Sequence, residues 1–509
     1  MNENFKEQSW IPLILVAFAS FIIALDATFM NVSISQLVVD LNTELGTVQT
    51  IIAFYTLITA SLMLLSSKLQ DIAGKRKIFL IGASIYGIGA LIASLSQNAT
   101  MLFVGWSLLE GIGGALMTPA TVSIISGTYA GERRTTALAI SSAIIGIAAA
   151  IGPLFGGVVT TFLSWRYGFV FELLIIVIIF VMYRKIPDFL PTASRSDLDI
   201  VGAIISIVGL VLFVIGILIL SDNFTLSLAV MALGIVFLIV FAWFELKRKK
   251  NGKVPLFDIQ LLNDKNLKTG TGIRLITNLA MGGSLFAVSI YLQTVLGLSA
   301  FMTGLILLPL TVGMLIFSVI APKLALKFNH KVIMALGFII AIVGCLFLSH
   351  QFTLTTKFTD ILPGMFIFGA GLGLVMALGL DITLMNVPAE SQNNASGFVT
   401  TGQTLGMSMG TALIGVILII GAVGGLHDAI DTYAPNKVTD QEFHDNMHLY
   451  FEKLGNVNTT QLKTQDNLAE KIVSKVSQDA MALVMHITAI LLAIGFVLSL
   501  RLDDRKIKN

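Results

Sequence analysis

Residues 10–34 read WIPLILVAFASFIIALDATFMNVSI, an apolar stretch that contains a single charged residue, Asp26. A helix needs about 20 mostly apolar residues to cross the hydrocarbon core of a bilayer. A charged side chain in that environment costs about 2.5–3.5 kcal/mol or more, and such residues are usually functional. This stretch therefore predicts both a membrane-spanning helix and a role for Asp26.

The rest of the chain repeats this pattern. Of its 509 residues, 55% are hydrophobic and only 12% are charged, whereas a soluble domain is about a quarter charged. In the stretches 138–162 and 299–322, Pro153 and Pro309 can bend or break the helix. We predict an all-α integral membrane protein with fourteen spans, at 10–34, 47–67, 78–97, 101–126, 138–162, 167–184, 199–220, 225–246, 268–295, 299–322, 331–350, 360–386, 396–421 and 481–501.

The basic residues are distributed unevenly between the two sides of the membrane. With the N-terminus in the cytoplasm, cytoplasmic segments hold 24 Lys and Arg and outer segments hold 7, while Arg274 lies inside a span. Five of the outer seven fall in one long loop, 422–480, to which the positive-inside rule scarcely applies. We therefore expect a multi-pass protein of the plasma membrane with both termini cytoplasmic. Since the basic runs report topology, nucleic-acid binding is not needed to explain them.

Several classes of function find no support in the sequence. The single cysteine, Cys345, lies in a span, so no intramolecular disulfide can form. No Walker-type Gly-Lys-Ser/Thr sequence and no nucleophile–base arrangement is visible, so we expect neither ATP-driven export by this chain alone nor an enzyme. His444 and His448 are spaced i,i+4 but lack a third ligand, so we expect no metal site.

The chain also looks duplicated. Residues 67–76 are echoed by residues 322–331, at an offset of 255 residues. A second echo, at an offset of 258, relates Gly111, Glu132, Ala137 and Gly152 to Gly369, Glu390, Ala395 and Gly410. We predict an N-terminal six-helix bundle (1–190), two inserted helices (191–250), and a linker with a C-terminal six-helix bundle (251–509). Same-direction repeats around a central site are a recurrent transporter architecture.

The segment after the second span, residues 67–77, reads SKLQDIAGKRK. It resembles the loop 2–3 motif of the major facilitator superfamily, Gly-x-Leu-Ala-Asp-Arg-x-Gly-Arg-Lys. Positions 69, 71 and 74 match, 75 and 76 match by charge, and 67, 70 and 72 depart. Glycine permits a tight turn, and the acid can pair with a base or a helix N-terminus. We expect Asp71, Gly74, Lys75 and Arg76 to form a conformational latch between the two halves.

Two further motifs narrow the resemblance. Span five contains Gly152-Pro153-Leu-Phe-Gly156-Gly157, which resembles the antiporter motif Gly-x3-Gly-Pro-x2-Gly-Gly, with Ala148 at the leading glycine position. Small residues let helices approach closely, and proline bends them.

Span one, residues 25–32, reads LDATFMNV and resembles the Leu-Asp-x-Thr-Ile-Val-Asn-Val pattern of fourteen-span drug antiporters. The chain is thus identified as a member of the fourteen-span drug:H⁺ antiporter family, DHA2. The resemblance implies proton-driven efflux of drugs or other amphipathic or cationic molecules. It places Asp26 at the family's embedded acidic position and makes the proton gradient the energy source, with no cofactor.

Two departures from the family pattern change the charge of the spans. Where relatives carry the arginine of Arg-x-x-Gln-Gly in span four, this chain has Ser107, followed by Glu110 and Gly111. In span six, Glu172 occupies the asparagine position of Trp-Arg-Trp-x-Phe-x-x-Asn. One base is missing and two acids are gained, so the proton coupling is rewired or the transported species is cationic.

Helix geometry brings these acids to one depth. Span one runs outward and spans four and six run inward, so a rise of about 1.5 Å per residue puts Asp26, Glu110 and Glu172 all in the outer half. Desolvation and mutual repulsion both disfavour the charged forms of such acids. We expect the three to form a proton-coupling cluster that titrates as a set.

Candidate substrate contacts are spread over both halves. Arg274 and Asp381 lie at similar depths in spans nine and twelve, so they can form a pair that gates or clamps the substrate, unless Arg274 merely extends to the inner surface. The full set of candidate substrate-binding residues is Asn31, Trp106, Arg274, Asn278, Gln293, Asp381 and Gln403.

These observations favour a monomeric secondary transporter whose partners are the bilayer, protons and a small-molecule substrate. Two alternatives remain open. One is an exporter of a single metabolite, lipid or antibiotic, and the other is a non-transporting receptor or scaffold that uses the 422–480 loop.

Overall fold

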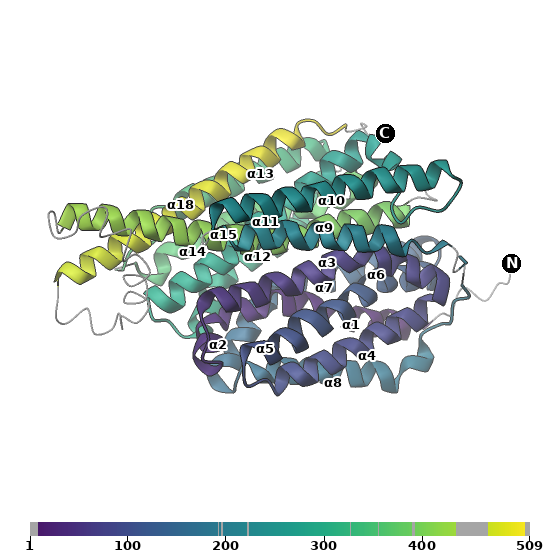
Figure 1. The fold of residues 1–509 in the computed structure, drawn as a ribbon, viewed down its shortest axis with the longest axis horizontal. Helices are drawn as coiled ribbons and strands as arrows, with labels where there is room; N and C mark the ends of the chain where they lie inside the picture. Colours follow the sequence, from purple (N-terminus) through teal and green to yellow (C-terminus); the bar gives the residue numbers. More distant parts are fainter. Residues whose placement is uncertain are drawn as a thin grey trace.

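The structure is a computed structural model that describes residues 9–191, 193–194, 197–220, 223–325, 327–354, 356–388, 392–433 and 467–503. All of its described elements are helical, as the sequence predicts. Thirteen described helices are long and apolar enough to cross a membrane. In Figure 1 they lie roughly along one axis, and the described chain starts and ends at the same end of the molecule, here called the terminus-bearing end.

The N-terminal bundle forms the lower half of Figure 1. Helix α1 packs on α6 and α7, and α4 packs on α6 and α8. Polar side chains cap the N-termini of some helices, as where Asn98 Oδ1 accepts from the Met101 N–H at 2.9 Å. Its elements are α1 (Ile11–Phe29), η2 (Met30–Val32), α2 (Ile34–Asp40), α3 (Leu45–Ala73), α4 (Lys75–Ser94), α5 (Ala99–Leu102), η3 (Phe103–Glu110), α6 (Gly111–Thr128), α7 (Gly131–Phe162) and α8 (Arg166–Val181).

Thirteen of the fourteen expected spans meet the length of a membrane helix in the described chain. The exception is 167–184, where α8 has only 16 residues, about 24 Å at the usual rise. Its end at Val181 is followed by a short 3-10 turn, η4 (Tyr183–Lys185). The prolines expected to interrupt two spans do not do so, since α7 continues through Pro153 and α12 through Pro309.

The inserted pair consists of α9 (Ile200–Leu218) and α10 (Phe224–Lys250), which pack on each other. Helix α9 also contacts α3 and α15, one helix from each bundle. The segment that follows, residues 251–264, contains a short 3-10 helix, η6 (Ile259–Asn263), and is called the strap below. Phe257 of the strap is fully buried and stacks on Phe398 of α15, with ring centroids 4.2 Å apart.

The C-terminal bundle forms the upper half of Figure 1 and repeats this arrangement. Helix α11 packs on α15, and α14 packs on both α12 and α13. The elements are α11 (Lys265–Ile290), η7 (Tyr291–Val295), α12 (Ala300–Ala325), α13 (His330–Leu348), α14 (Phe358–Leu384), α15 (Gln392–Tyr433) and α18 (Asn467–Ser499).

The expected outer loop, 422–480, is helical wherever it is described. Helix α15 continues to Tyr433 and α18 begins at Asn467, so both flanks are helical. The two helices pack through Leu426 and Val476 and extend beyond the bundle in Figure 1. His444 and His448 lie outside the described residues.

The two bundles meet along α3 with α15 and along α7 with α12. Away from the terminus-bearing end, the Ser35 N–H donates to Gln293 Oε1 at 3.2 Å and the Phe301 N–H donates to Thr161 Oγ1 at 2.9 Å. At mid-height, Ser408 Oγ donates to the Ala53 carbonyl at 2.7 Å. The molecule is therefore closed at the end away from the termini.

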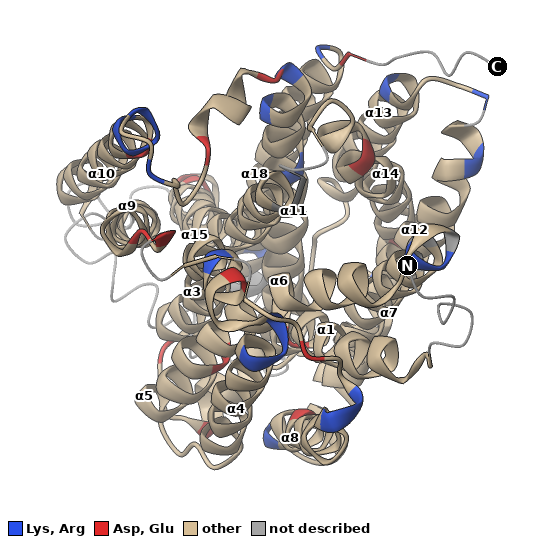
Figure 2. Ribbon diagram, turned by 90° about the vertical axis from the view of Figure 1, so that its right-hand side faces the viewer, with Lys and Arg blue, Asp and Glu red and all other residues tan. Residues whose placement is uncertain are grey.

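Lysines and arginines gather at the terminus-bearing end. Figure 2, which faces this end, shows them in blue at the end of α10 and near the starts and ends of neighbouring helices. The last turn of α10 alone contains Lys247, Arg248, Lys249 and Lys250. This distribution is typical of the cytoplasmic side of a membrane protein.

Candidate functional site

Span four leaves regular α-helical geometry at the place where its acid lies. Residues Phe103–Glu110 form a π-helical segment, η3, between α5 and α6. Such wider turns are uncommon and occur frequently at functional sites. A Cβ on Gly89 of α4 would lie 2.8 Å from Glu110 Cγ, so the absence of a side chain lets α4 approach this turn. The local geometry therefore places Trp106 and Glu110 inside the N-terminal bundle.

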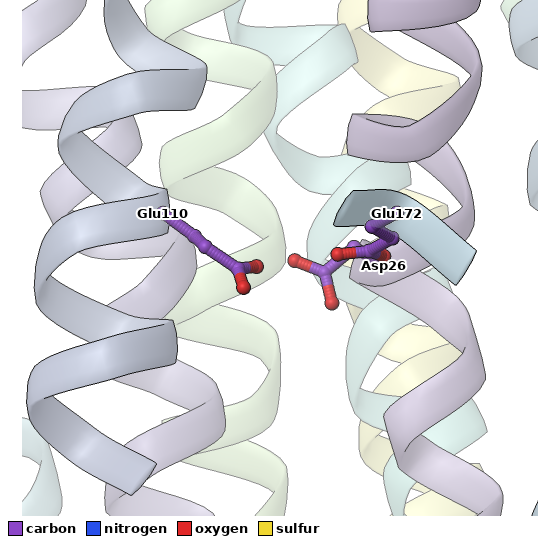
Figure 3. A group of neighbouring side chains, drawn as sticks. All are labelled: Asp26, Glu110 and Glu172. Carbon is purple, nitrogen blue, oxygen red and sulfur yellow. The ribbon is translucent and has the colours of Figure 1, made fainter. Parts of the chain in front are cut away.

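Asp26, Glu110 and Glu172 converge there, as the sequence predicts. They come from α1, η3 and α8, and each is fully buried. Figure 3 shows their carboxyl groups pointing toward one another. One carboxylate oxygen of each lies within 4.8 Å of those of the other two. We call these three residues the acid triad.

The triad has few polar partners. Trp106 Nε1–H donates to Asp26 Oδ2 at 2.8 Å, and the Tyr86 hydroxyl donates to Glu172 Oε2 at 3.1 Å. Among the described residues, Asp26 Oδ1, Glu172 Oε1 and both Glu110 oxygens have no hydrogen-bond partner. The Trp106 indole also stacks on the Tyr55 ring, with centroids 5.4 Å apart.

No basic side chain of the described chain forms an ion pair with the triad. Burying an unpaired carboxylate costs far more than burying a hydrogen-bonded neutral group, and two carboxylates at this spacing repel each other. The three acids can therefore be buried together only if protons, or a bound cation, remove most of their charge. The same oxygens are also the only described group of acids, histidines and cysteines close enough to hold a metal ion.

The glycine-rich motif of span five packs on α1 beside the triad. A Cβ on Gly152 would collide with the Thr28 hydroxyl, and one on Gly156 would collide with the Phe29 carbonyl. On the other side, Gly157 faces the Ala300 carbonyl of α12, and Gly304 of α12 faces the Pro153 carbonyl. The motif thus joins the acid-bearing helix of one bundle to the opposite bundle.

The C-terminal bundle contains a partly buried base instead. Arg274 of α11 donates through Nη2 to Gln403 Oε1 of α15, and its Nε has no partner. Asn278 Nδ2 donates to the Arg274 carbonyl at 2.9 Å. The expected pair with Asp381 does not form, because the Asp381 side chain is 75% exposed and its oxygen lies 3.5 Å from His330 Nε2. Depth alone suggested the pair, but the two side chains point in different directions.

Comparison with known proteins agrees with this architecture. The family model described as "Major Facilitator Superfamily" matches residues 16–199 and 196–411. The chain belongs to the Major Facilitator Superfamily. It is 26% identical over 416 residues to the multidrug efflux pump LfrA of Mycolicibacterium smegmatis, covering 81% of each chain. It is 28% identical to the quinolone resistance protein NorB of Staphylococcus aureus (74% of this chain, 82% of NorB).

Another relative is named for a single metabolite. The riboflavin transporter RibZ of Clostridioides difficile is 25% identical over 418 residues, which cover 80% of this chain and 87% of RibZ.

The superfamily's loop 2–3 motif makes its described contacts within the N-terminal half. Gly74 has φ of +92°, and a Cβ there would lie 2.9 Å from the Phe189 carbonyl oxygen. Lys75 Nζ lies 5.0 Å from the Phe189 ring, and Arg76 pairs with Asp188 at 2.6 Å. The Asp71 carbonyl accepts from the Ala193 N–H at 3.1 Å. The latch between halves stays a prediction for another state of this transporter.

Three other candidate residues have structural partners in this state. Asn31 is buried, and its Nδ2 lies 3.4 Å from the Ala27 and Thr28 carbonyls. Gln293 accepts from Ser35 where the two bundles close. Trp106 holds Asp26. Their roles in substrate binding stay predictions.

Sequence reasoning missed Tyr55 and Tyr86, which surround the triad, and the Glu245–Asp199 pair at the base of the inserted helices. Tyrosines within spans are common, and nothing in their spacing marks these two. Glu245 was overlooked because an acid near the end of a span resembles an ordinary interfacial residue. Its burial, at 1% exposure, became apparent only from the packing of the strap.

Proposed function

We propose that this chain is a proton-coupled exporter of amphipathic small molecules, in the fourteen-span drug:H⁺ antiporter branch of its superfamily. The acid triad carries the proposal. Three fully buried carboxyls without a described base need protons to be neutral, and removal of those protons drives them toward a cation or toward water. The efflux and resistance relatives support export as the direction of transport.

The cycle uses the two bundles as rocking bodies. In the state described here the contacts between bundles close the end away from the termini. With the termini cytoplasmic, substrate enters from the cytoplasm or the inner leaflet of the plasma membrane. When the end away from the termini opens, the triad is exposed to external protons. Their binding displaces the substrate and favours the return to the state that is open to the cytoplasm. The bundles alternate about the α3–α15 and α7–α12 seams.

Each motif contributes to the movement of the bundles in this cycle. The glycines at 152 and 156 keep α7 against α1, so a movement of α7 relative to α12 is transmitted to the helix that carries Asp26. Asp71, Gly74, Lys75 and Arg76 latch the terminus-bearing end when it closes. Protons are the only energy source in this scheme, and the protein acts as a monomer without a cofactor.

Flux measurements in proteoliposomes test the proposal. Purified protein is reconstituted, a pH gradient is imposed, and movement of the dye rhodamine 123 is followed together with proton flux reported by an internal pH dye. The proposal expects gradient-driven dye accumulation and dye-induced proton movement. Dye movement that is indifferent to the gradient would refute proton coupling, and no flux of any compound would favour a receptor or scaffold.

One alternative has specific support. A relative that is named as a riboflavin transporter is 25% identical to this chain, which supports a single metabolite as the substrate. Saturable, gradient-driven flux of one compound, with no competition from unrelated dyes, would identify such a dedicated exporter.

A further inference from the structure

Arg274 is a basic residue with no acidic partner in the described part of the chain. It lies in the α11 span, and its guanidinium contacts the side-chain oxygen of Gln403, a neutral group. No described residue hydrogen-bonds with its Nε. Among the residues that the structure describes, no carboxylate lies within ion-pair distance of Arg274, and Asp381 is engaged with His330 instead. The guanidinium therefore has unused donors that face no negative charge.

The direction of the side chain argues against extension to the membrane surface. Arg274 is nine residues from the start of α11 at Lys265, which places it about 13 Å along the helix. Its side chain runs across the bundle, because it reaches Gln403 of α15 and a Cβ on Gly379 of α14 would lie 3.5 Å from Nη1. A guanidinium held sideways by an amide between three helices is positioned, whereas one that snorkels follows its own helix toward water.

Two close neighbours do not take up the remaining donors of the guanidinium. Gly379 contributes no side chain, and the Asn278 amide is directed to the Arg274 carbonyl, so neither occupies the guanidinium's free edge. Arg274 is also partly exposed, unlike the acid triad. An arginine presents paired N–H donors in a fork that matches a carboxylate, and such charge-assisted pairs are about twice as strong as neutral hydrogen bonds.

We propose that Arg274, positioned by Gln403, forms a subsite for a carboxylate on the transported molecule. The inference rests on the proposed transport function and names its substrate class: amphipathic molecules that carry an acid group, including zwitterions. The acid end binds the C-terminal bundle, while the triad in the N-terminal bundle handles protons. The two bundles thus contribute opposite charges to one transport cycle.

A matched pair of dyes tests the subsite without requiring transport. Rhodamine 110 carries a free carboxylate, and rhodamine 123 is its methyl ester with the same ring system. Equilibrium binding to the protein in nanodiscs is measured by fluorescence polarisation. We expect rhodamine 110 to bind about tenfold more tightly than rhodamine 123, the size of one charge-assisted contact. Equal affinities, tighter binding of the ester, or binding of neither dye would overturn the proposal.

Two variants assign the preference to this arginine. Arg274→Gln removes the charge and is expected to make the affinities for rhodamine 110 and rhodamine 123 equal. Gln403→Glu keeps the arginine, adds an almost isosteric carboxylate beside it, and is expected to abolish the preference by pairing with the guanidinium internally. The second variant preserves packing, so a folding defect in the first does not decide the outcome.

The control is Lys323→Gln, which removes an exposed positive charge from the last turn of α12. It is expected to keep the tenfold preference, which shows that net charge at this end is not responsible. Retention of the preference in Gln403→Glu would overturn the subsite even if proton-driven flux is intact. Loss of proton-driven flux with the preference intact would instead contradict the proposed function alone.

Discussion

Two groups of buried acids in this protein differ in the basic and hydrogen-bonding partners that surround them. In the acid triad, three carboxyls share one indole N–H and one phenol, and no described base reaches them. At the base of the inserted helices, Asp199 and Glu245 are also buried, but Asp199 lies 3.6 Å from Arg248 Nε. Glu245 Oε2 accepts from the Leu256 N–H of the strap at 2.7 Å.

The difference separates a structural charge cluster from a functional one. Asp199 caps α9 by accepting from the Gly202 N–H, and Glu245 anchors the strap against α10, so both acids have fixed duties in this state. One oxygen of each, Asp199 Oδ2 and Glu245 Oε1, also lacks a hydrogen-bond partner among the described residues, but Arg248 lies beside Asp199, whereas no described base lies beside the triad. We therefore expect changes in the triad to alter coupling, and changes in the Asp199–Glu245 pair to alter stability.

The largest effect is expected for Asp26→Asn. The amide keeps the size of the side chain and its contact with Trp106 but cannot exchange a proton. Gradient-driven dye flux in proteoliposomes should fall by about 10–100-fold, the range of a coupling free energy between two ligands. Dye binding to the purified protein should remain. Unchanged gradient-driven flux in a well-expressed Asp26→Asn protein would remove the triad from the mechanism.

Glu110→Gln should change the pH dependence of flux more than its maximum rate. Neither Glu110 oxygen has a hydrogen-bond partner among the residues that the structure describes, so the neutral amide costs less to bury than the carboxylate it replaces. We expect a flatter profile of flux against pH, and a smaller loss of thermal stability at alkaline pH than in the wild type. The matched control is Glu245→Gln, whose profile of flux against pH should follow the wild type.

Glu245→Ala should lower stability without uncoupling transport. It leaves the Leu256 N–H without its acceptor, which typically costs about 1–3 kcal/mol, and it frees the strap that carries Phe257. A lower Tm in detergent is expected, with gradient-driven flux still present. A loss of proton coupling at normal Tm would show that the inserted helices share in the proton pathway and would break the comparison.

Trp106→Phe should have the smallest effect. It deletes the N–H that binds Asp26 Oδ2 and keeps an aromatic ring against Tyr55. A single hydrogen bond contributes about 0.5–1.5 kcal/mol net, so the midpoint of the pH profile should shift by no more than about one unit. A complete loss of transport would mean that the indole contacts the substrate directly.

The sequence predicts well how deep a residue lies in the membrane, but predicts poorly in which direction its side chain points. The rise per residue placed Asp26, Glu110 and Glu172 at one level, and the structure brings them together. The same reasoning placed Arg274 and Asp381 at one level, and there it failed, because rotation about each helix axis depends on packing partners that are distant in sequence.

Other features depend on contacts that no local pattern encodes. The π-helical turn at Phe103–Glu110 and the approach of Gly89 are needed to direct Glu110 inward. The burial of Glu245 depends on the strap folding back across α10. The spans, by contrast, follow from hydrophobicity alone, and among the expected spans in the described chain only α8 falls short of the length of a membrane helix.

Infrared difference spectroscopy tests the central claim most directly, since protonated carboxyls absorb apart from carboxylates. The protein in nanodiscs is titrated with rhodamine 110, and the signal of protonated carboxyls is compared between the wild type, Asp26→Asn, Glu110→Gln and Glu245→Gln. The account predicts that dye binding changes this signal in the wild type and in Glu245→Gln, and that the change is lost or altered in the two triad variants. An identical change in all four proteins, or none in the wild type, would contradict it.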